Sequence, residues 1–173
     1  DKCILPFLIT ERLEFFQLTQ ADLPELEILL GDTEIMYAWE HGFTKIESQA
    51  WLNENLRRYS SDGYSYWAVR KKNDGSLIGV MGILKEVAEG KQYIGIGYIL
   101  NKKYWGQGYA GEGTEALCQY AFRKLQLQTL TAQVRTNNFA SQHIAEGLGM
   151  KAMCNFVKIY RGQEMPHFLY TLD

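Results

Sequence analysis

The sequence predicts an α/β fold: one domain over residues 1–173, with about seven strands in a mixed, mostly antiparallel sheet and four helices. Two capping boxes, Thr19-Gln20-Ala21-Asp22 and Thr44-Lys45-Ile46-Glu47, open helices in the first third. Asn73-Asp74-Gly75 joins two strand-like runs as a hairpin turn. A later segment, residues 110–125, repeats apolar residues at helical spacing. This mixture of elements predicts helices packed on a mixed sheet.

The first elements precede that hairpin. Residues 4–18 are rich in Leu, Ile and Phe and are expected to form one strand, followed by a helix that ends at Leu30. The helix opened at Thr44 should end before the Ser60-Ser61-Asp62-Gly63 turn. Its inward face is expected to carry Ile46, Ala50 and Trp51.

The later elements alternate between strands and helices. Strands are expected over residues 64–72, 76–87, 93–100 and 129–135, helices over 110–125 and 139–146, and two last strands on either side of Arg161-Gly162. The first three of these strands should be antiparallel, since hairpin turns join them.

Composition excludes several classes of protein. No apolar run approaches the ~18 residues of a membrane helix, and no Lys/Arg-rich run is interleaved with aromatic residues, so neither a membrane nor a nucleic acid is an expected partner. Residues 11–63 carry 4 basic and 11 acidic side chains, whereas residues 64–173 carry 13 and 8. This asymmetry indicates either two ligands of opposite charge or simply solvated helix faces.

Cysteine and histidine spacing indicates no metal site. The three cysteines are far apart, which favours free thiols and a cytoplasmic location: Cys3, Cys118 and Cys154. The three histidines also lack the spacing of metal ligands, so no metal is expected.

A glycine-rich turn is the clearest functional motif. Gly106, Gln107, Gly108, Tyr109, Ala110 and Gly111 match G-x-G-x-x-G between a strand and a helix. Such glycines let a phosphate approach the backbone at the positive end of a helix. Lys102 and Lys103 stand just upstream and would add positive charge. The alternative is that the glycines only allow close packing of the helix on the sheet.

A dinucleotide-binding protein is a second interpretation of the same turn. That interpretation requires an acidic residue ~20 positions later, at the end of the next strand. The next strand, Thr129-Leu130-Thr131-Ala132-Gln133-Val134-Arg135, contains no acid. The motif also follows three antiparallel strands, which argues against a doubly wound sheet.

Four segments in order resemble the GNAT acetyltransferases, and within that family the RimJ/RimL-like branch that acetylates ribosomal-protein N-termini. They are Leu8-Ile9-Thr10-Glu11-Arg12-Leu13, Ile96-Gly97-Tyr98-Ile99-Leu100, Tyr104-Trp105-Gly106-Gln107-Gly108-Tyr109-Ala110-Gly111-Glu112, and Asn137-Asn138-Phe139-Ala140-Ser141 running into Gly147-Leu148-Gly149-Met150. The resemblance implies one GNAT-like domain with splayed central strands and acetyl-CoA as co-substrate.

The resemblance also implies where acetyl-CoA would bind. The backbone of the glycine-rich turn would hold the pyrophosphate, and the pantetheine would lie along Tyr98, Ile99 and Leu100. Asn138 would hydrogen-bond the coenzyme arm, although asparagine is equally suited to capping a helix.

Of the catalytic side chains that the resemblance implies, one is present in this chain and two are replaced. Ser141 matches the serine proposed as general acid in the branch, but a helix serine also bonds readily to backbone. Relatives often have a tyrosine where this chain has Ala145, and a glutamate base where it has Gly95. A GNAT-fold module that binds coenzyme A with weak or no catalysis is therefore an alternative.

The acceptor is expected to be a primary amine, with a protein N-terminal α-amine favoured over a small-molecule amine. Trp39 and Glu40 lie in the acidic third of the chain, where an aromatic ring and a carboxylate suit a cation. The alternative is that Trp39 is a core side chain and Glu40 a solvated one. The sequence leaves a homodimer open.

Overall fold

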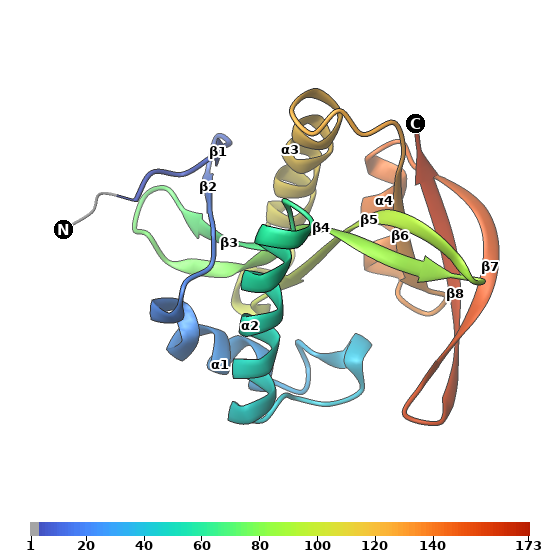
Figure 1. Ribbon diagram of the computed structural model, residues 1–173, viewed down its shortest axis with the longest axis horizontal. Coiled ribbons are helices and arrows are strands. Elements are labelled where there is room, and N and C mark those ends of the chain that lie inside the picture. Colours follow the sequence, from blue (N-terminus) through green and yellow to red (C-terminus); the bar gives the residue numbers. More distant parts are fainter. Residues whose placement is uncertain (1–3) are drawn as a thin grey trace. The chain divides into compact units, whose positions relative to one another are not determined.

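The computed structural model describes residues 4–173, which form four α-helices and an eight-stranded, mostly antiparallel sheet (Figure 1). The strand order is β1-β2-β3-β4-β5-β6-β8-β7, in which β5 and β6 are parallel. The elements are β1 (Leu8–Ile9), β2 (Leu13–Phe16), α1 (Leu23–Gly31), α2 (Lys45–Ser61), β3 (Tyr66–Lys71), β4 (Leu77–Ala88), β5 (Lys91–Leu100), α3 (Tyr109–Arg123), β6 (Leu130–Arg135), α4 (Phe139–Gly147), β7 (Lys151–Tyr160) and β8 (Gln163–Leu172). The predicted fold class is confirmed, with eight strands in place of about seven.

The chain divides into two compact units. The first comprises the residues up to Gly82 together with Tyr98–Gly113, and the second comprises Ile83–Gly97 and Thr114–Asp173. The divisions fall inside β4, β5 and α3. That residues 1–173 make one domain stays a prediction.

The additional strand comes from a reversal near the N-terminus. Residues 4–18 were expected to form one strand, but β1 and β2 form an antiparallel pair. Thr10 makes the reversal, because its N–H donates to the Leu13 carbonyl (2.9 Å) and its hydroxyl accepts from the Leu13 N–H (3.0 Å). The expectation of a single strand was wrong because a threonine without glycine or proline gave no turn signal.

The capping boxes lie where the sequence predicts them. The Thr44 hydroxyl accepts from the Glu47 N–H (3.1 Å), and the Glu47 carboxylate accepts from the Thr44 N–H (3.0 Å), which opens α2. The Thr19 N–H donates to the Asp22 carboxylate (2.8 Å) at the short 3-10 turn that leads into α1. All three bonds satisfy backbone N–H groups at a helix start.

The buried face of α2 differs from the prediction. Ile46 is 83% exposed, Ala50 is exposed and Trp51 is half-buried, whereas Ser48, Leu52 and Asn55 are buried. The Asn55 side chain accepts from the Ser65 hydroxyl and the Tyr66 N–H (3.1 Å) and donates to the Trp51 carbonyl (2.8 Å). Because a hydrogen-bonded amide can be buried, the apolar pattern alone did not identify this face.

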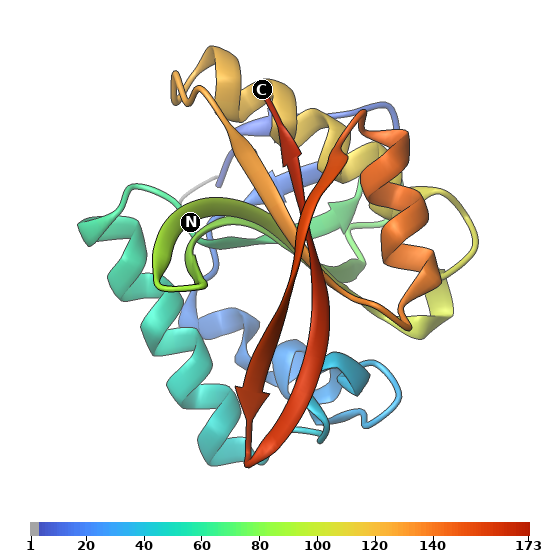
Figure 2. The same cartoon turned by 90° about the vertical axis from the view of Figure 1, so that its right-hand side faces the viewer.

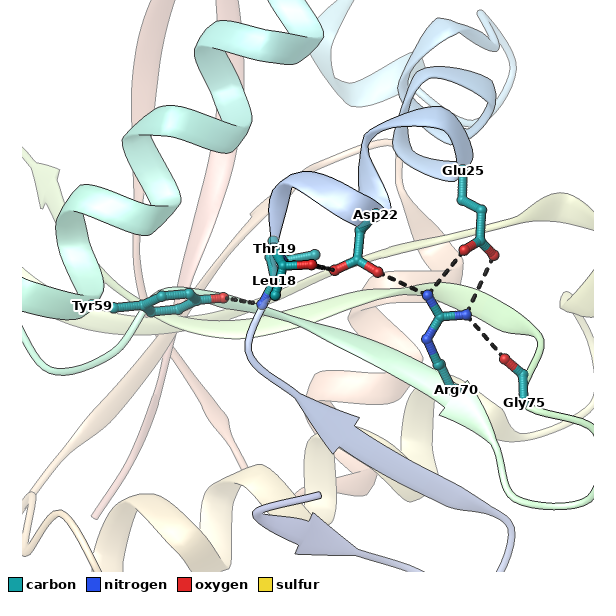
Figure 3. A network of polar contacts seen from close by, with 7 residues as sticks. All are labelled: Leu18, Thr19, Asp22, Glu25, Tyr59, Arg70 and Gly75. Atoms are coloured by element: carbon teal, nitrogen blue, oxygen red, sulfur yellow. Dashed lines mark hydrogen bonds and ion pairs between the residues drawn. The ribbon is translucent and has the colours of Figure 1, made fainter. Parts of the chain in front are cut away.

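An ion-pair network joins α1 to the β3–β4 hairpin (Figure 3). Arg70 on β3 pairs with Asp22 (2.8 Å) and Glu25 (2.9 Å) and donates to the Gly75 carbonyl (3.0 Å). Beside it, Tyr59 of α2 accepts from the Leu18 N–H (3.1 Å). These contacts fix how the chain passes from the first strands into α1.

The second unit is built around a long β7–β8 hairpin (Figure 2). β8 pairs with β6 on its other side, and the hairpin turns at Arg161 and Gly162, both with positive φ, as the sequence predicts. Phe156, Leu169 and Ala88 form a buried cluster against Tyr93. Within the same unit Cys118 is a buried free thiol and Cys154 an exposed one, while Cys3 lies outside the described residues.

None of the helices formed by residues 4–173 has the length and apolar character needed to cross a membrane.

Candidate functional site

The glycine-rich turn leads directly into α3 in the first unit. Gly106 and Gly108 have φ values of 72° and 83°, a region that favours glycine. The helix begins at Tyr109, and its first backbone bond runs from the Glu112 N–H to the Gly108 carbonyl (3.1 Å). The two glycines therefore provide the sharp change of direction that starts the helix, and the positive end of its dipole lies at this turn.

Close packing does not account for the glycines of this turn. A Cβ placed on Gly106 or Gly111 would meet no heavy atom within 4 Å, and one on Gly108 would meet only the Arg12 guanidinium at 3.5 Å. Gly113 is different, because a Cβ there would lie 2.3 Å from Met81 Sδ and 3.3 Å from the Phe15 ring. Gly113 thus allows α3 to pack closely, whereas Gly106 and Gly111 face open space.

Arg12, in the loop between β1 and β2, contacts the glycine-rich turn. Its Nη1 donates to the Gln107 carbonyl (3.0 Å), and its guanidinium lies 4.1 Å from the centre of the Tyr109 ring. Its Nε pairs with the Glu112 carboxylate at 2.7 Å. One side chain therefore contacts the turn, the first residue of α3 and a carboxylate in the first turn of the helix.

The Glu112 carboxylate links the start of α3 to the reversal between β1 and β2. Besides Arg12 Nε, its carboxylate accepts from the Thr10 hydroxyl (2.6 Å) and the Arg12 N–H (3.0 Å). Partial burial acts to raise the pKa of Glu112, but the hydrogen bonds from Thr10 and Arg12 outweigh it and the pKa is lowered. The carboxylate therefore stays ionised and holds α3 to the β1–β2 reversal. In the sequence, Thr10, Arg12 and Glu112 fall within family-like segments, but no pattern there assigned them a role.

The connection before the turn is also ordered. The Trp105 indole N–H donates to the Leu100 carbonyl (2.8 Å), and the Asn101 side chain accepts from the Lys103 N–H (3.0 Å). Lys102, expected to add charge to the turn, instead pairs with Asp32 (3.0 Å) and Glu34 (3.3 Å). The ammonium of Lys102 is thus engaged by acidic side chains of the segment after α1.

The strand expected to bind pantetheine is held closely by its neighbour. Ile99 and Leu100 are buried, and Tyr98 is half-buried. A Cβ on Gly79 of β4 would lie 2.2 Å from the Ile99 carbonyl oxygen. Gly79 therefore lets β4 approach the end of β5.

The candidate acceptor residues lie in a loop before α2. Trp39 is half-buried and ends a short 3-10 turn, and Glu40 is exposed with a φ of 65°. His41 fixes this loop, because its Nδ1 lies 3.0 Å from the Trp39 carbonyl oxygen and its Nε2 lies 2.8 Å from the Glu47 carboxylate. Trp39, Glu40 and His41 are adjacent in the sequence, and His41 links this group to α2.

Asn138 and Ser141 lie together in the second unit. Asn138 caps α4, and its side-chain oxygen accepts from the Ser141 N–H (3.1 Å). The capping role that the sequence left open is therefore present, and it uses the oxygen of the side chain rather than its NH₂ group. Ser141 is half-buried in the first turn of α4, and His143 is exposed.

The parallel strands β5 and β6 meet at one point in the described chain. Their register is Gly95 with Thr131, and the Thr131 hydroxyl donates to the Ile94 carbonyl (3.3 Å). β6 is six residues long and pairs along its whole length with β8. The two central strands thus pair briefly in the second unit.

No group of three or more His, Cys, Asp or Glu side chains among residues 4–173 is arranged to hold a metal ion.

Comparison with known proteins adds to this geometry. A family model described as an acetyltransferase (GNAT) domain matches residues 12–151. YkkB of Bacillus subtilis, an uncharacterized protein, is 30% identical over 144 residues, which cover 83% of this chain and 84% of YkkB.

Solved structures share the fold. A GNAT-family acetyltransferase from Bacillus anthracis superposes with a TM-score of 0.83 at 23% identity, covering 95% of this chain and 96% of that one. RimL, a ribosomal L7/L12 α-N-protein acetyltransferase solved with coenzyme A, gives 0.80 at 18% identity, covering 98% and 97%. With the family model covering most of the sequence, the chain belongs to the GNAT acetyltransferases and is an acyltransferase.

Proposed function

We propose that this protein is an acetyl-CoA-dependent N-acetyltransferase that acetylates a primary amine, and that its preferred acceptor is the α-amine of a protein N-terminus. The observation that carries the proposal is the turn before α3: two positive-φ glycines, open space beside Gly106 and Gly111, and a helix N-terminus. These features suit a pyrophosphate held by backbone N–H groups. The RimJ/RimL-like resemblance supports the choice of acceptor.

The proposed binding of acetyl-CoA follows from these features. The turn of residues 106–111 would hold the pyrophosphate, and the pantetheine would extend along residues 98–100 of β5. Arg12 would act indirectly, because it holds the Gln107 carbonyl and Glu112 in place. The NH₂ group of Asn138, which the helix cap does not use, would donate to the coenzyme arm.

The reaction removes two protons from the acceptor nitrogen and adds one proton to the leaving sulfur. The acceptor ammonium loses a proton, and the nitrogen lone pair then attacks the thioester carbon. When the carbon–sulfur bond breaks, sulfur leaves with the electron pair and takes a proton as the amide nitrogen loses its second one. We assign Ser141 as the donor to sulfur; its hydroxyl then regains a proton from the second one that the nitrogen loses. Trp39 and Glu40 are proposed to bind the cationic acceptor through a ring face and a carboxylate.

The fraction of an acceptor amine that is neutral limits how fast that acceptor can react. An α-amine with a pKa near ~8 is about one-tenth neutral at pH 7, whereas a lysine amine near ~10.4 is neutral only about once in 2,500. The difference is more than a hundredfold in reactive species. An α-amine is therefore the better acceptor unless the enzyme supplies a much stronger base for lysine.

A coenzyme A-binding module without turnover is the second candidate. The buried Ala145 stands where relatives often carry a tyrosine, and Gly95 where they often carry a glutamate. Such a module would bind coenzyme A but release no thiol.

Thiol release from acetyl-CoA separates the two candidates. The assay compares peptides with a free N-terminus, the same peptides with a blocked N-terminus and an internal lysine, polyamines and small-molecule amines. We expect release with free N-termini and little with blocked ones. Binding of coenzyme A without release across this panel would support the module, and faster release with lysine would contradict the preferred acceptor.

A further inference from the structure

We propose that Glu86, on β4, is the general base that accepts the proton of the acceptor amine, an assignment that rests on the proposed acetyltransferase function. Gly95 leaves the usual place of the base without a side chain. The Glu86 carboxylate, from the neighbouring strand, lies where the Cβ of a side chain at position 95 would be.

The carboxylate lies directly beside the Gly95 backbone. A Cβ built on Gly95 would lie 1.8 Å from Glu86 Oε1 and 2.9 Å from Glu86 Cδ. Atoms at such distances overlap, so any side chain at position 95 would have to displace the carboxylate. Gly95 does not have the positive φ seen at Gly106 and Gly108. A side chain at position 95 would therefore have to move the end of the Glu86 side chain, whereas the backbone conformation itself does not call for glycine.

The position of Glu86 suits a proton acceptor. Gly95 is the residue of β5 that pairs with Thr131 of β6, and it precedes Tyr98, the first residue of the proposed pantetheine segment, by three positions on the same strand. The Glu86 side chain is half-buried, between exposed Lys85 and exposed Val87. Half-burial leaves this carboxylate within reach of an acceptor.

The proton balance is simple. Glu86 takes one proton from the acceptor ammonium, which frees the nitrogen lone pair for attack on the thioester carbon, and later returns that proton to solvent. The thiolate receives its proton separately. Any carboxylate accepts this proton more readily from an α-amine with a pKa near ~8 than from a lysine amine with a pKa near ~10.4. Glu86 therefore reinforces the preference for N-terminal amines.

Two variants test the assignment. Glu86→Gln keeps the size of the side chain and removes the proton acceptor. The pair Glu86→Ala with Gly95→Glu moves the carboxylate to β5, into space that the shortened side chain at position 86 leaves open, with the Thr131 carbonyl oxygen 3.3 Å from the new Cβ. Glu89→Gln, an exposed carboxylate in the same β4–β5 hairpin, is the matched control.

The measurements are the pH profile of kcat/KM with a free N-terminal peptide, the affinity for coenzyme A, and the melting temperature. We expect Glu86→Gln to lower kcat/KM by about 100-fold or more near neutral pH, with the loss shrinking as pH rises and the amine deprotonates without help. Coenzyme A affinity and melting temperature should match those of Glu89→Gln. The Glu86→Ala/Gly95→Glu variant, with its relocated carboxylate, should have a kcat/KM at least about tenfold higher than that of Glu86→Ala alone.

The outcomes distinguish this proposal from the function on which it rests. Turnover by the unmodified enzyme together with an unchanged pH profile in Glu86→Gln would overturn the role of Glu86 alone. A folded Glu86→Ala/Gly95→Glu protein no faster than Glu86→Ala would also overturn it. Absence of turnover by the unmodified enzyme with every amine would overturn both proposals.

Discussion

At the residue scale, Gly111 offers a direct test of the pyrophosphate site. It lies in the first turn of α3, and a Cβ there meets no atom within 4 Å. Gly111→Ala should be more stable by up to about 1 kcal/mol, because alanine favours the helix, and its methyl group should weaken coenzyme A binding less than a carboxylate does. Gly111→Glu should weaken coenzyme A binding at least about tenfold, because a carboxylate would meet the phosphates.

Calorimetric titration with coenzyme A and thermal unfolding check both variants. An acidic residue in the first turn stabilises a helix, so loss of binding by Gly111→Glu would not come from unfolding. Equal coenzyme A affinity in Gly111→Ala and Gly111→Glu would show that the pyrophosphate does not bind at this turn.

Replacement of Arg12 should change both the stability of the protein and its affinity for coenzyme A. Arg12→Ala leaves the partly buried Glu112 carboxylate without its ion-pair partner and releases the Gln107 carbonyl. We expect a loss of about 1–2 kcal/mol in the free energy of unfolding, since the guanidinium is partly exposed, and weaker coenzyme A binding. Denaturant unfolding and titration measure the two effects. Arg57→Ala, which removes an exposed pair with Glu54 inside α2, is the control and should change both little.

At the element scale, the start of α4 separates capping from coenzyme binding. Asn138→Asp and Asn138→Ser keep a side-chain oxygen for the Ser141 N–H but lose the NH₂ donor. Both should unfold at nearly the normal denaturant concentration and bind coenzyme A less tightly. Asn138→Ala should in addition lose about 1 kcal/mol of stability. Normal coenzyme affinity in the Asp and Ser variants would leave capping as the only role of Asn138.

Elements governed by local signals could be predicted from the sequence, and those that depend on distant partners could not. The Thr44–Glu47 box and the Arg161-Gly162 turn involve neighbouring residues, so their patterns were sufficient. The buried face of α2 depends on the contact of Asn55 with Ser65, in the connection just before β3. At the site, the glycine-rich turn could be recognised as a motif. The Arg12–Glu112 ion pair joins residues 100 positions apart, so no local sequence pattern predicts it.

At the scale of the whole molecule, His167 makes stability depend on pH. It is buried in β8, and burial lowers its pKa, as do the positive charges of Lys158 and Arg135, against the opposing effect of its hydrogen bond with the Met165 carbonyl. Between the folded and unfolded pKa values the unfolded chain binds more protons. This contribution to stability is therefore present above about pH 6.5 and is lost as pH falls below it.

Denaturant unfolding at pH 7.5 and 5.5 measures the effect. The unmodified protein should lose more stability between these pH values than His167→Gln does. His143→Gln, at an exposed position on α4, should behave as the unmodified protein. An equal loss in the unmodified protein and in His167→Gln would show that other groups cause the pH dependence.

The proposed reaction transfers an acetyl group from acetyl-CoA to an N-terminal amine. The most direct measurement uses one peptide that carries both a free α-amine and an internal lysine, incubated with enzyme and acetyl-CoA, with the acetylated position located by fragmentation mass spectrometry. We expect an acetyl group on the α-amine, formed only in the presence of enzyme. Acetylation of the lysine in preference to the α-amine, or none above the background without enzyme, would contradict it.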